Sequence, residues 1–274
     1  MEKIDFIVNE NIDLSKVLRK TLPLLSNYQI EKLFKDKDVK VNGVRKIKSC
    51  IVKKGDHVEV FYNITNNEAW CETVFEDDNI LIVNKREGVE VVSETDRNLL
   101  DILLLNYDEL YAVHRIDRNT QGLVVFAKNK EAENELLMAF KTRTIIKKYL
   151  LKVKGKVHIE AIKHKMYLKK LSESSKVLVS EIKTSGYDEI VTKFSVVKFL
   201  ENETILSAEL ITGKTHQIRA HIAYFGYPIV GDGKYGLGDK IMCLTAYFIA
   251  FKFPKKSKLE YLNQITFEIK PTWL

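Results

Sequence analysis

Cysteine is scarce in this sequence, and its scarcity excludes two kinds of stabilisation. The chain contains three cysteines, Cys50, Cys71 and Cys243, which are odd in number and widely separated. A disulfide framework needs paired cysteines, and a zinc site needs closely spaced ligands. We therefore expect neither, and we expect a reduced, cytoplasmic protein.

Long apolar runs are missing as well. The longest, residues 242–251, is half of the roughly 20 residues that a membrane-spanning helix requires, and it contains Thr245. Residues 1–5 lack the pattern of a signal peptide. The sequence therefore predicts no membrane partner.

Positive charge is what the chain has in excess. The net charge is +7 and the pI is about 9.0, while 45% of the residues are hydrophobic and 30% are charged. This composition is typical of a folded globular protein. The charge favours a polyanionic partner such as nucleic acid.

The most informative stretch, residues 114–128, has a polar half and an apolar half. Asp117 stands between Arg115 and Arg118, and residues 123–127 form an apolar run that predicts a buried strand. A polar loop anchored by a core strand is a common place for reactive groups. The residues alone leave two interpretations open. Asp117 either forms a turn, or it is a carboxylate kept ionised by guanidinium groups that serves as a nucleophile or general base.

A second stretch, residues 212–221, contains His216 and His221. A spacing of five places two side chains about 140° apart on a helix and on opposite faces of a strand. The two imidazoles therefore do not converge on one ion, and we expect no metal site.

Together the two stretches resemble the RluA-type pseudouridine synthases. Residues 114–123 match the family motif His-Arg-Leu-Asp-x-x-Thr-x-Gly-Leu, with Ile116 in place of Leu and Gln121 where Ser is common. Residues 212–221 match Thr-Gly-Arg-Thr-His-Gln-Ile-Arg-x-His, with Lys214 in place of Arg. That exchange keeps the charge and loses bidentate recognition. The resemblance covers essentially the whole chain.

This resemblance implies roles for particular residues. Asp117 becomes the essential carboxylate, which attacks ribose C1′ or abstracts a proton in a glycal route. Arg219 forms an ion pair with Asp117, and Tyr149 stacks on the flipped base. His114 and Arg115 shape the loop or contact RNA phosphates.

Three further residues join the expected substrate site. Lys214 and His216 come from the second motif, and Leu244 from the closing strand that lines the uracil pocket. Residues 84–88 occupy the family's Asn-Lys-Pro loop but lack its proline. The reaction needs no metal, nucleotide or redox cofactor, so we expect none.

The first 62 residues are expected to form a small domain that begins with two helices. Asp13 predicts the N-cap of a helix over 14–22, and Ser26 with Gln29 predicts a capping box for a helix over 27–37. A hairpin signal, Asn-Gly, and a strand over 57–62 follow them.

This segment also carries much of the positive charge. It has thirteen Lys and Arg residues against nine Asp and Glu, a net charge of +4. Its order of elements resembles the small RNA-binding domain named after a ribosomal small-subunit protein, the S-four fold. The side chains expected to contact RNA are Arg19, Lys20, Lys32, Lys35, Lys40 and Arg45.

The remaining chain alternates strands and helices. Strands are expected over 80–85 and 144–153, helices over 96–107 and 131–140, and a turn at residues 77–79. The six basic side chains between residues 163 and 176, histidine included, lie on a hairpin that is either solvated or in contact with RNA.

The expected fold is α+β, a mixed, mostly antiparallel sheet with flanking helices, preceded by the small domain. The expected boundaries are 1–62 for the RNA-binding domain, 63–70 for a linker and 71–274 for the catalytic domain. The expected partner is large-subunit ribosomal RNA, and the chain is expected to be a monomer. The alternatives are the same chemistry on transfer RNA and a ribosome- or RNA-binding protein without catalysis.

Overall fold

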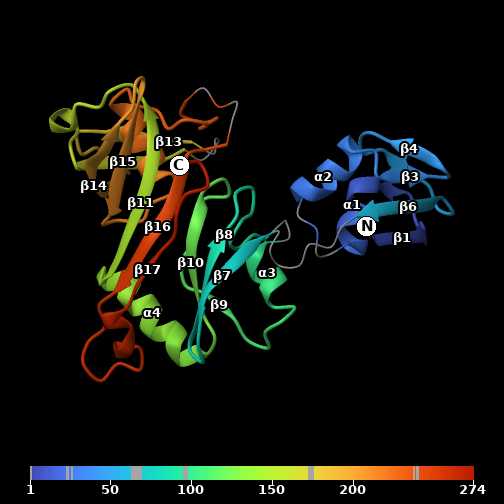
Figure 1. Cartoon of the computed structure of the whole chain (residues 1–274), viewed down its shortest axis with the longest axis horizontal. Helices are drawn as coiled ribbons and strands as arrows, with labels where there is room; N and C mark the ends of the chain where they lie inside the picture. The colour runs from blue at the N-terminus through green and yellow to red at the C-terminus, as the bar shows by residue number, and fades with distance from the viewer. Residues whose placement is uncertain are drawn as a thin grey trace.

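The computed structural model describes residues 2–22, 25, 27–62, 70–94, 98–171, 176–236, 238 and 241–274. Within these ranges the chain forms two bodies, a smaller one over residues 2–62 and a larger one over residues 70–274 (Figure 1). Each body has its own cluster of buried apolar side chains.

The smaller body is a four-stranded antiparallel sheet with two helices. The order of its strands is β1-β6-β3-β4, and β2 pairs with β5 beside them. Its elements are β1 (Glu2–Ile7), β2 (Ile12–Asp13), α1 (Leu14–Thr21), α2 (Asn27–Lys35), β3 (Val39–Val41), β4 (Val44–Lys46), β5 (Ile51–Val52) and β6 (His57–Tyr62).

Local sequence signals explain the helices and the hairpin of this body. The Asp13 carboxylate accepts a hydrogen bond from Ser15 N at 2.9 Å, which confirms the predicted N-cap of α1. Helix α2 ends before the predicted position, because Lys37 adopts a left-handed conformation with φ of 60°. Asn42 and Gly43 have φ of 51° and 79°, the geometry of a tight hairpin turn, and confirm the Asn-Gly signal. The predicted capping box, at Ser26 and Gln29, lies outside the described residues.

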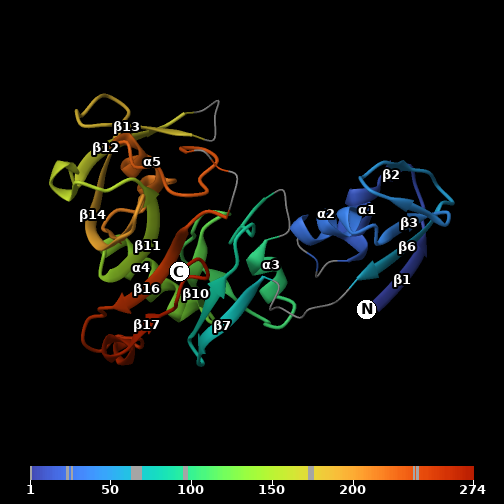
Figure 2. The same ribbon diagram turned by 45° about the horizontal axis from the view of Figure 1, so that its top comes forward.

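The larger body is one curved sheet of eleven strands with helices on both faces (Figure 2). The order along the sheet is β13-β12-β14-β15-β11-β16-β10-β8-β7, with β9 paired to β10 and β17 to β16. Its strands are β7 (Cys71–Glu76), β8 (Ile80–Lys85), β9 (Tyr111–Ala112), β10 (Gln121–Ala127), β11 (Ile145–Lys154), β12 (Lys165–Lys170), β13 (Val177–Ser180), β14 (Asp188–Phe199), β15 (Glu203–Leu210), β16 (Leu244–Phe251) and β17 (Thr266–Glu268). Its helices are α3 (Leu99–Leu103), α4 (Lys130–Thr142) and α5 (Gln217–Tyr224), with the 3-10 helices η2 (Ile159–Ala161) and η3 (Glu260–Gln264).

Strand β10 lies at the centre of this body and is buried along its whole length. Val124 and Phe126 face one core, whereas Leu123, Val125 and Ala127 face the other. Burial on both faces explains why the strand is a continuous apolar run in the sequence. β10 is parallel to β16, and every other strand pair in the described ranges is antiparallel. The predicted mixed, mostly antiparallel sheet is confirmed.

Two predicted boundaries differ from the structure. The helix expected over 96–107 is only α3, because Asn98 and Asp101 form a capping box that begins the helix at Leu99. It ends five residues later, where Leu104 and Leu105 turn toward solvent and offer no apolar face for a longer helix. Trp70, the last residue of the expected linker, is buried in the core of the larger body.

The basic segment expected between residues 163 and 176 contributes to a hairpin of β12 and β13. Residues 172–175 of this segment lie outside the described part. Lys163 pairs with Glu181, and Lys165 pairs with Glu189 at 2.7 Å. No helix in the described ranges is both long and apolar enough to cross a membrane.

Candidate active site

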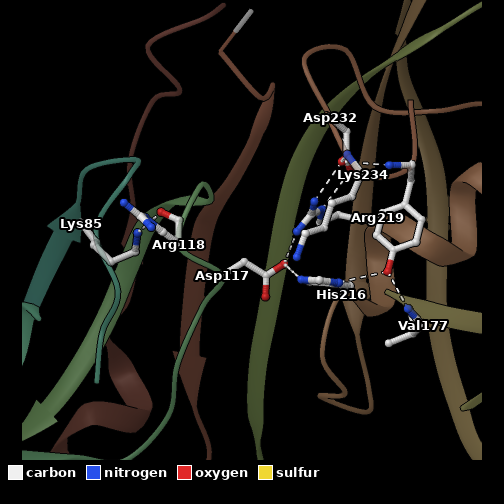
Figure 3. Close-up of polar contacts among 9 residues, drawn as sticks. Lys85, Asp117, Arg118, Val177, His216, Arg219, Asp232 and Lys234 are labelled. Carbon is white, nitrogen blue, oxygen red and sulfur yellow. Dashed lines mark hydrogen bonds and ion pairs between the residues drawn. The ribbon is translucent and has the colours of Figure 1, made fainter. Parts of the chain in front are cut away.

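Asp117 lies on the loop that connects β9 to β10. Its Oδ2 accepts a hydrogen bond from Arg219 Nη1 at 3.0 Å (Figure 3). The sequence predicted this pair across 102 residues, and the structure confirms it. The other oxygen, Oδ1, has no hydrogen-bond donor within the described part of the chain, and the side chain is 26% exposed. Asp117 therefore presents one anchored oxygen and one open oxygen.

Arg219 projects from α5 and is held from two sides, with only 6% of its side chain exposed. Its Nε and Nη2 donate to the two oxygens of Asp232 at 2.8 and 2.9 Å. Such a two-point contact fixes the plane of a guanidinium group, so the remaining nitrogen, Nη1, is directed at Asp117 (Figure 3). Burial alone would lower the pKa of Arg219, but the hydrogen bonds and charges of the two carboxylates raise it above its usual value. Arg219 therefore stays charged.

Asp232 is a site residue to which the sequence assigned no role. Its side chain is completely buried. Besides Arg219, it accepts hydrogen bonds from the backbone N–H groups of Lys234 at 2.9 Å and Tyr235 at 3.2 Å. Burial raises the pKa of this carboxyl group, yet these donors outweigh the effect and lower it. Asp232 is therefore an ionised anchor behind Arg219.

His216 faces Asp117 from the start of α5. Its Nδ1 lies 3.0 Å from the Tyr235 hydroxyl, which accepts a hydrogen bond from Val177 N at 2.9 Å. With its oxygen occupied in this way, the hydroxyl donates its proton to Nδ1, and we assign the imidazole proton to Nε2. Nε2 lies 3.9 Å from Asp117 Oδ2 (Figure 3), and a proton there points toward the carboxylate. Burial lowers the pKa of His216 to about 4, so the ring is neutral at pH 7.

A pocket of about 460 Å³ opens between these groups. This volume lies within the range of small-molecule sites. The pocket is lined by every residue predicted for the catalytic and substrate sites: His114, Arg115, Asp117, Tyr149, Lys214, His216, Arg219 and Leu244.

Tyr149 and Leu244 are core residues that also reach this pocket. Tyr149 lies on β11 and is 7% exposed, and the register of β11 against β16 shifts between Lys148 and Tyr149. Such irregularities redirect side chains next to active sites. Burial, together with the charge of Asp117, raises the pKa of Tyr149, so its hydroxyl stays protonated.

His114 holds the Asp117 loop against the sheet. Its Nε2 accepts a hydrogen bond from Val125 N at 2.9 Å, and its ring stacks on Phe140 with centroids 4.7 Å apart. Burial, with the nearby charge of Lys147, lowers the pKa of His114 to about 3. Of the two roles expected for His114, this geometry supports shaping the loop, because a neutral ring that accepts a hydrogen bond does not bind phosphate as a cation.

Lys85 is the second site residue to which the sequence assigned no role. It is fully buried, and its Nζ donates to the carbonyl oxygens of Arg86 at 2.8 Å, Val89 at 2.7 Å and Arg118 at 3.0 Å. It thereby connects the loop after β8 to the loop of Asp117 (Figure 3). Burial lowers the pKa of Lys85 to about 7, and the charge of Asp117 opposes this shift.

The six basic residues predicted as the RNA contacts of the first domain lie in the smaller body and do not line the pocket. Most of them are exposed to solvent: Arg19, Lys20, Lys32, Lys35 and Arg45; Lys40 is partly buried. Lys214 lines the pocket but pairs with Asp188 at 2.7 Å, so it is not a free cation.

Known proteins resemble this chain over most of its length. Residues 79–224 match the family model for RNA pseudouridylate synthases. An uncharacterized RNA pseudouridine synthase of Mycoplasma capricolum is 33% identical, and the match covers 98% of each chain. Ribosomal large subunit pseudouridine synthase C of Rickettsia bellii is 31% identical over 85% of each chain. The dual-specificity RNA pseudouridine synthase RluA of Vibrio vulnificus is 34% identical over 76% of this chain and 82% of its own.

Solved structures support the fold. Human RNA pseudouridylate synthase domain containing 1 aligns with a TM-score of 0.61 and 20% identity, over 78% of this chain and 88% of its own. The family model and these relatives define an enzyme that acts on RNA. The chain belongs to the RNA pseudouridylate synthase family, and within it to the RluA type.

Proposed function

We propose that this protein converts specific uridines of large-subunit ribosomal RNA to pseudouridine, with Asp117 as the reactive carboxylate. The observation that carries this proposal is the open Oδ1 of Asp117, on a carboxylate whose other oxygen is held by the buried Arg219. The choice of RNA follows the Rickettsia bellii relative, which is named for the large ribosomal subunit.

The reaction rearranges bonds without adding or removing atoms overall. The bond between ribose C1′ and uracil N1 breaks, the base turns, and a bond from C1′ to C5 forms. C5 then loses its proton, and N1 gains one. Asp117 either attacks C1′ while the base is detached, or it abstracts a ribose proton in a glycal route. Both uses require an ionised carboxylate with one free oxygen.

The residues around Asp117 have complementary roles in this proposal. Arg219 balances the carboxylate charge and fixes its direction. Tyr149 gives the flipped base a stacking surface, and Leu244 forms an apolar wall of the pocket. Arg115 and Lys214 are placed at the pocket to meet the RNA.

Residues 1–62 would serve as the RNA-binding domain and residues 71–274, together with the buried Trp70, as the catalytic domain, with the linker between them. The support is the separate core of the smaller body and the exposed basic side chains on it. Each contact between such a side chain and a phosphate releases counterions and strengthens binding at low salt. We place the enzyme in the cytoplasm, as a monomer and without a cofactor.

The test is tritium release from RNA labelled at uracil C5. We expect release from large-subunit ribosomal RNA by the wild type and none by Asp117→Asn, which keeps the shape and removes the charge. Release by both proteins would mean that another group reacts. Release only from transfer RNA would show that the substrate is transfer RNA and not ribosomal RNA. No release from either RNA, together with tight RNA binding, would favour a protein that binds without catalysis.

A further inference from the structure

Several cations line the pocket, and they differ in their partners. Arg115, Arg143 and Lys147 form no ion pair within the described ranges, whereas Lys214 pairs with Asp188. Arg115 and Arg143 are exposed, so water solvates their charges. Lys147 is different, because its side chain is partly buried and its pKa is lowered by burial alone.

Lys147 lies two residues before Tyr149 on β11, and both side chains line the pocket. Its Nζ is 5.2 Å from the centre of the Phe140 ring and 3.8 Å from the position that a Cβ on Gly213 would occupy. The ammonium group thus lies between the end of α4 and the loop that leads to α5.

Two carboxylates also line the pocket, Asp117 and Glu189, and neither forms an ion pair with Lys147 within the described ranges. Burial and the charge of Asp117 raise the pKa of Tyr149, whereas burial lowers the pKa of Lys147. Burial, with the charge of Lys147, lowers the pKa of His114, whose ring stays neutral. A cation that has lost solvent without gaining a counter-charge is costly. An anion supplied by the substrate would compensate for that loss.

We propose that Lys147 binds a backbone phosphate of the target nucleotide while Asp117 faces its ribose. The proposal rests on the proposed function, because a flipped uridine enters the pocket with its phosphates attached. The base occupies the end at Tyr149 and Leu244, and the phosphate takes the end at Lys147. A phosphate at this position gives Lys147 the counter-charge that the described side chains around it do not supply.

The competing explanation is that the Lys147 stem only packs on Phe140. The chain offers a matched control for it, because Lys148 is the next residue of the same strand. Its Nζ lies 5.0 Å from the centre of the Phe248 ring, and it does not line the pocket. A purely structural role predicts similar effects of replacing either lysine, whereas a phosphate site predicts an effect of Lys147 alone.

The experiment compares the full-length wild type with Lys147→Met, Lys147→Arg and Lys148→Met. The first readout is the salt dependence of binding to a large-subunit ribosomal RNA transcript. One lost phosphate contact reduces the slope of log K against log salt by about 0.7–0.9. We expect this reduction for Lys147→Met, and wild-type slopes for Lys147→Arg and Lys148→Met. An unchanged slope for Lys147→Met, or equal changes for both Met variants, would overturn the proposal.

The second readout identifies the phosphate as one on the target nucleotide. Pseudouridine and its 5′- and 3′-monophosphates are compared as inhibitors of tritium release. We expect one monophosphate to inhibit the wild type about tenfold more strongly than the nucleoside, a difference of about 1.4 kcal/mol. Lys147→Met should lose this preference, and Lys148→Met should retain it. Equal inhibition of the wild type by all three compounds would contradict the proposal. Absence of tritium release by the wild type would instead contradict the proposed function. The salt slopes would still test whether Lys147 contacts an RNA phosphate.

Discussion

Arg219 and Asp232 are joined by two hydrogen bonds of 2.8 and 2.9 Å, in a setting where neither side chain meets solvent appreciably. The pair consumes two of the three guanidinium nitrogens and leaves Nη1 for Asp117. The single positive charge of Arg219 therefore interacts with two carboxylates, the fully buried Asp232 and Asp117, which faces the pocket. In the proposed mechanism, the direction of the Asp117 carboxylate therefore depends on Asp232, which does not line the pocket.

Replacing Asp232 with Asn tests this dependence. The amide presents a donor to a guanidinium nitrogen, so Arg219 loses its fixed plane and shifts away from Asp117. A displacement of about 1 Å at a reacting group can lower the rate about a hundredfold, and we expect a decrease in kcat of that order. Because Asp232 does not line the pocket, KM should change little. Tritium release at several RNA concentrations measures both constants.

The control for Asp232→Asn is Glu131→Gln. Glu131 pairs with Lys258 on an exposed surface away from the pocket, and such pairs contribute about 0–1 kcal/mol. Its kcat should remain within twofold of the wild type. If Asp232→Asn has wild-type kcat, Arg219 does not need its anchor, and our account of the site is wrong.

The hydrogen bond between Tyr235 and His216 leads to a second prediction. Tyr235→Phe removes the hydroxyl that donates to His216 Nδ1, so the imidazole proton is no longer confined to Nε2. We expect nitrogen NMR to show a single Nε2–H tautomer in the wild type and a mixture in the variant. If that proton orients Asp117, Tyr235→Phe and His216→Gln should each reduce kcat, and the double variant should be no slower than His216→Gln. Additive losses, or an Nδ1–H tautomer in the wild type, would exclude this arrangement.

The parts of the fold that could be predicted from sequence depend on local chemistry. The hairpin at Asn42-Gly43 follows because these two residues tolerate positive φ, and β10 follows from its apolar run. The Asp117–Arg219 pair was predicted because both residues belong to long motifs of one family. The predicted length of the helix at α3 was wrong. The apolar pattern of the sequence continues to Leu104 and Leu105, but these side chains lie outside the core.

The roles of Asp232 and Lys85 depend instead on approaches between distant segments. Asp232 reaches Arg219 because Gly231, with φ of 82°, packs so tightly on residues 241–242 that a Cβ would lie 2.8 Å from Met242 N. The amino-acid sequence contains no local signal for this contact between Gly231 and residues 241–242. Lys85 stands at the end of an apolar strand, where a lysine is ordinarily solvated. Only the fold shows that three carbonyl groups surround it.

Gly122 gives a third prediction, because its backbone has no space for a side chain. It has φ of 128°, and an added Cβ would lie 2.6 Å from Ala246 N in the neighbouring strand. Gly122→Ala must therefore force β10 and β16 apart just behind the Asp117 loop. We expect a loss of about 4 kcal/mol in unfolding free energy, measured by denaturant unfolding. Gly88→Ala is the control, because Gly88 also has positive φ but nothing within 4 Å of its Cβ position. It should cost only about 1 kcal/mol, and equal losses would refute the close-approach argument.

The last prediction concerns acid stability and involves three histidines. Burial lowers the pKa of His114 to about 3 and those of His216 and His221 to about 4. In the unfolded chain each of these histidines binds a proton below about pH 6.5, its ordinary pKa. In the folded chain they do not bind one until near pH 4. The stabilisation from keeping these rings neutral should therefore be complete above pH 6.5. The unfolding free energy should decrease as the pH falls toward 4, by up to about 1.4 kcal/mol per pH unit for each histidine. His114→Gln retains an acceptor for Val125 N and removes one of these protons. Urea unfolding between pH 4 and 7 should show a slope for this variant that is smaller by about one proton. An identical slope in the two proteins would show that His114 is not held neutral by the fold.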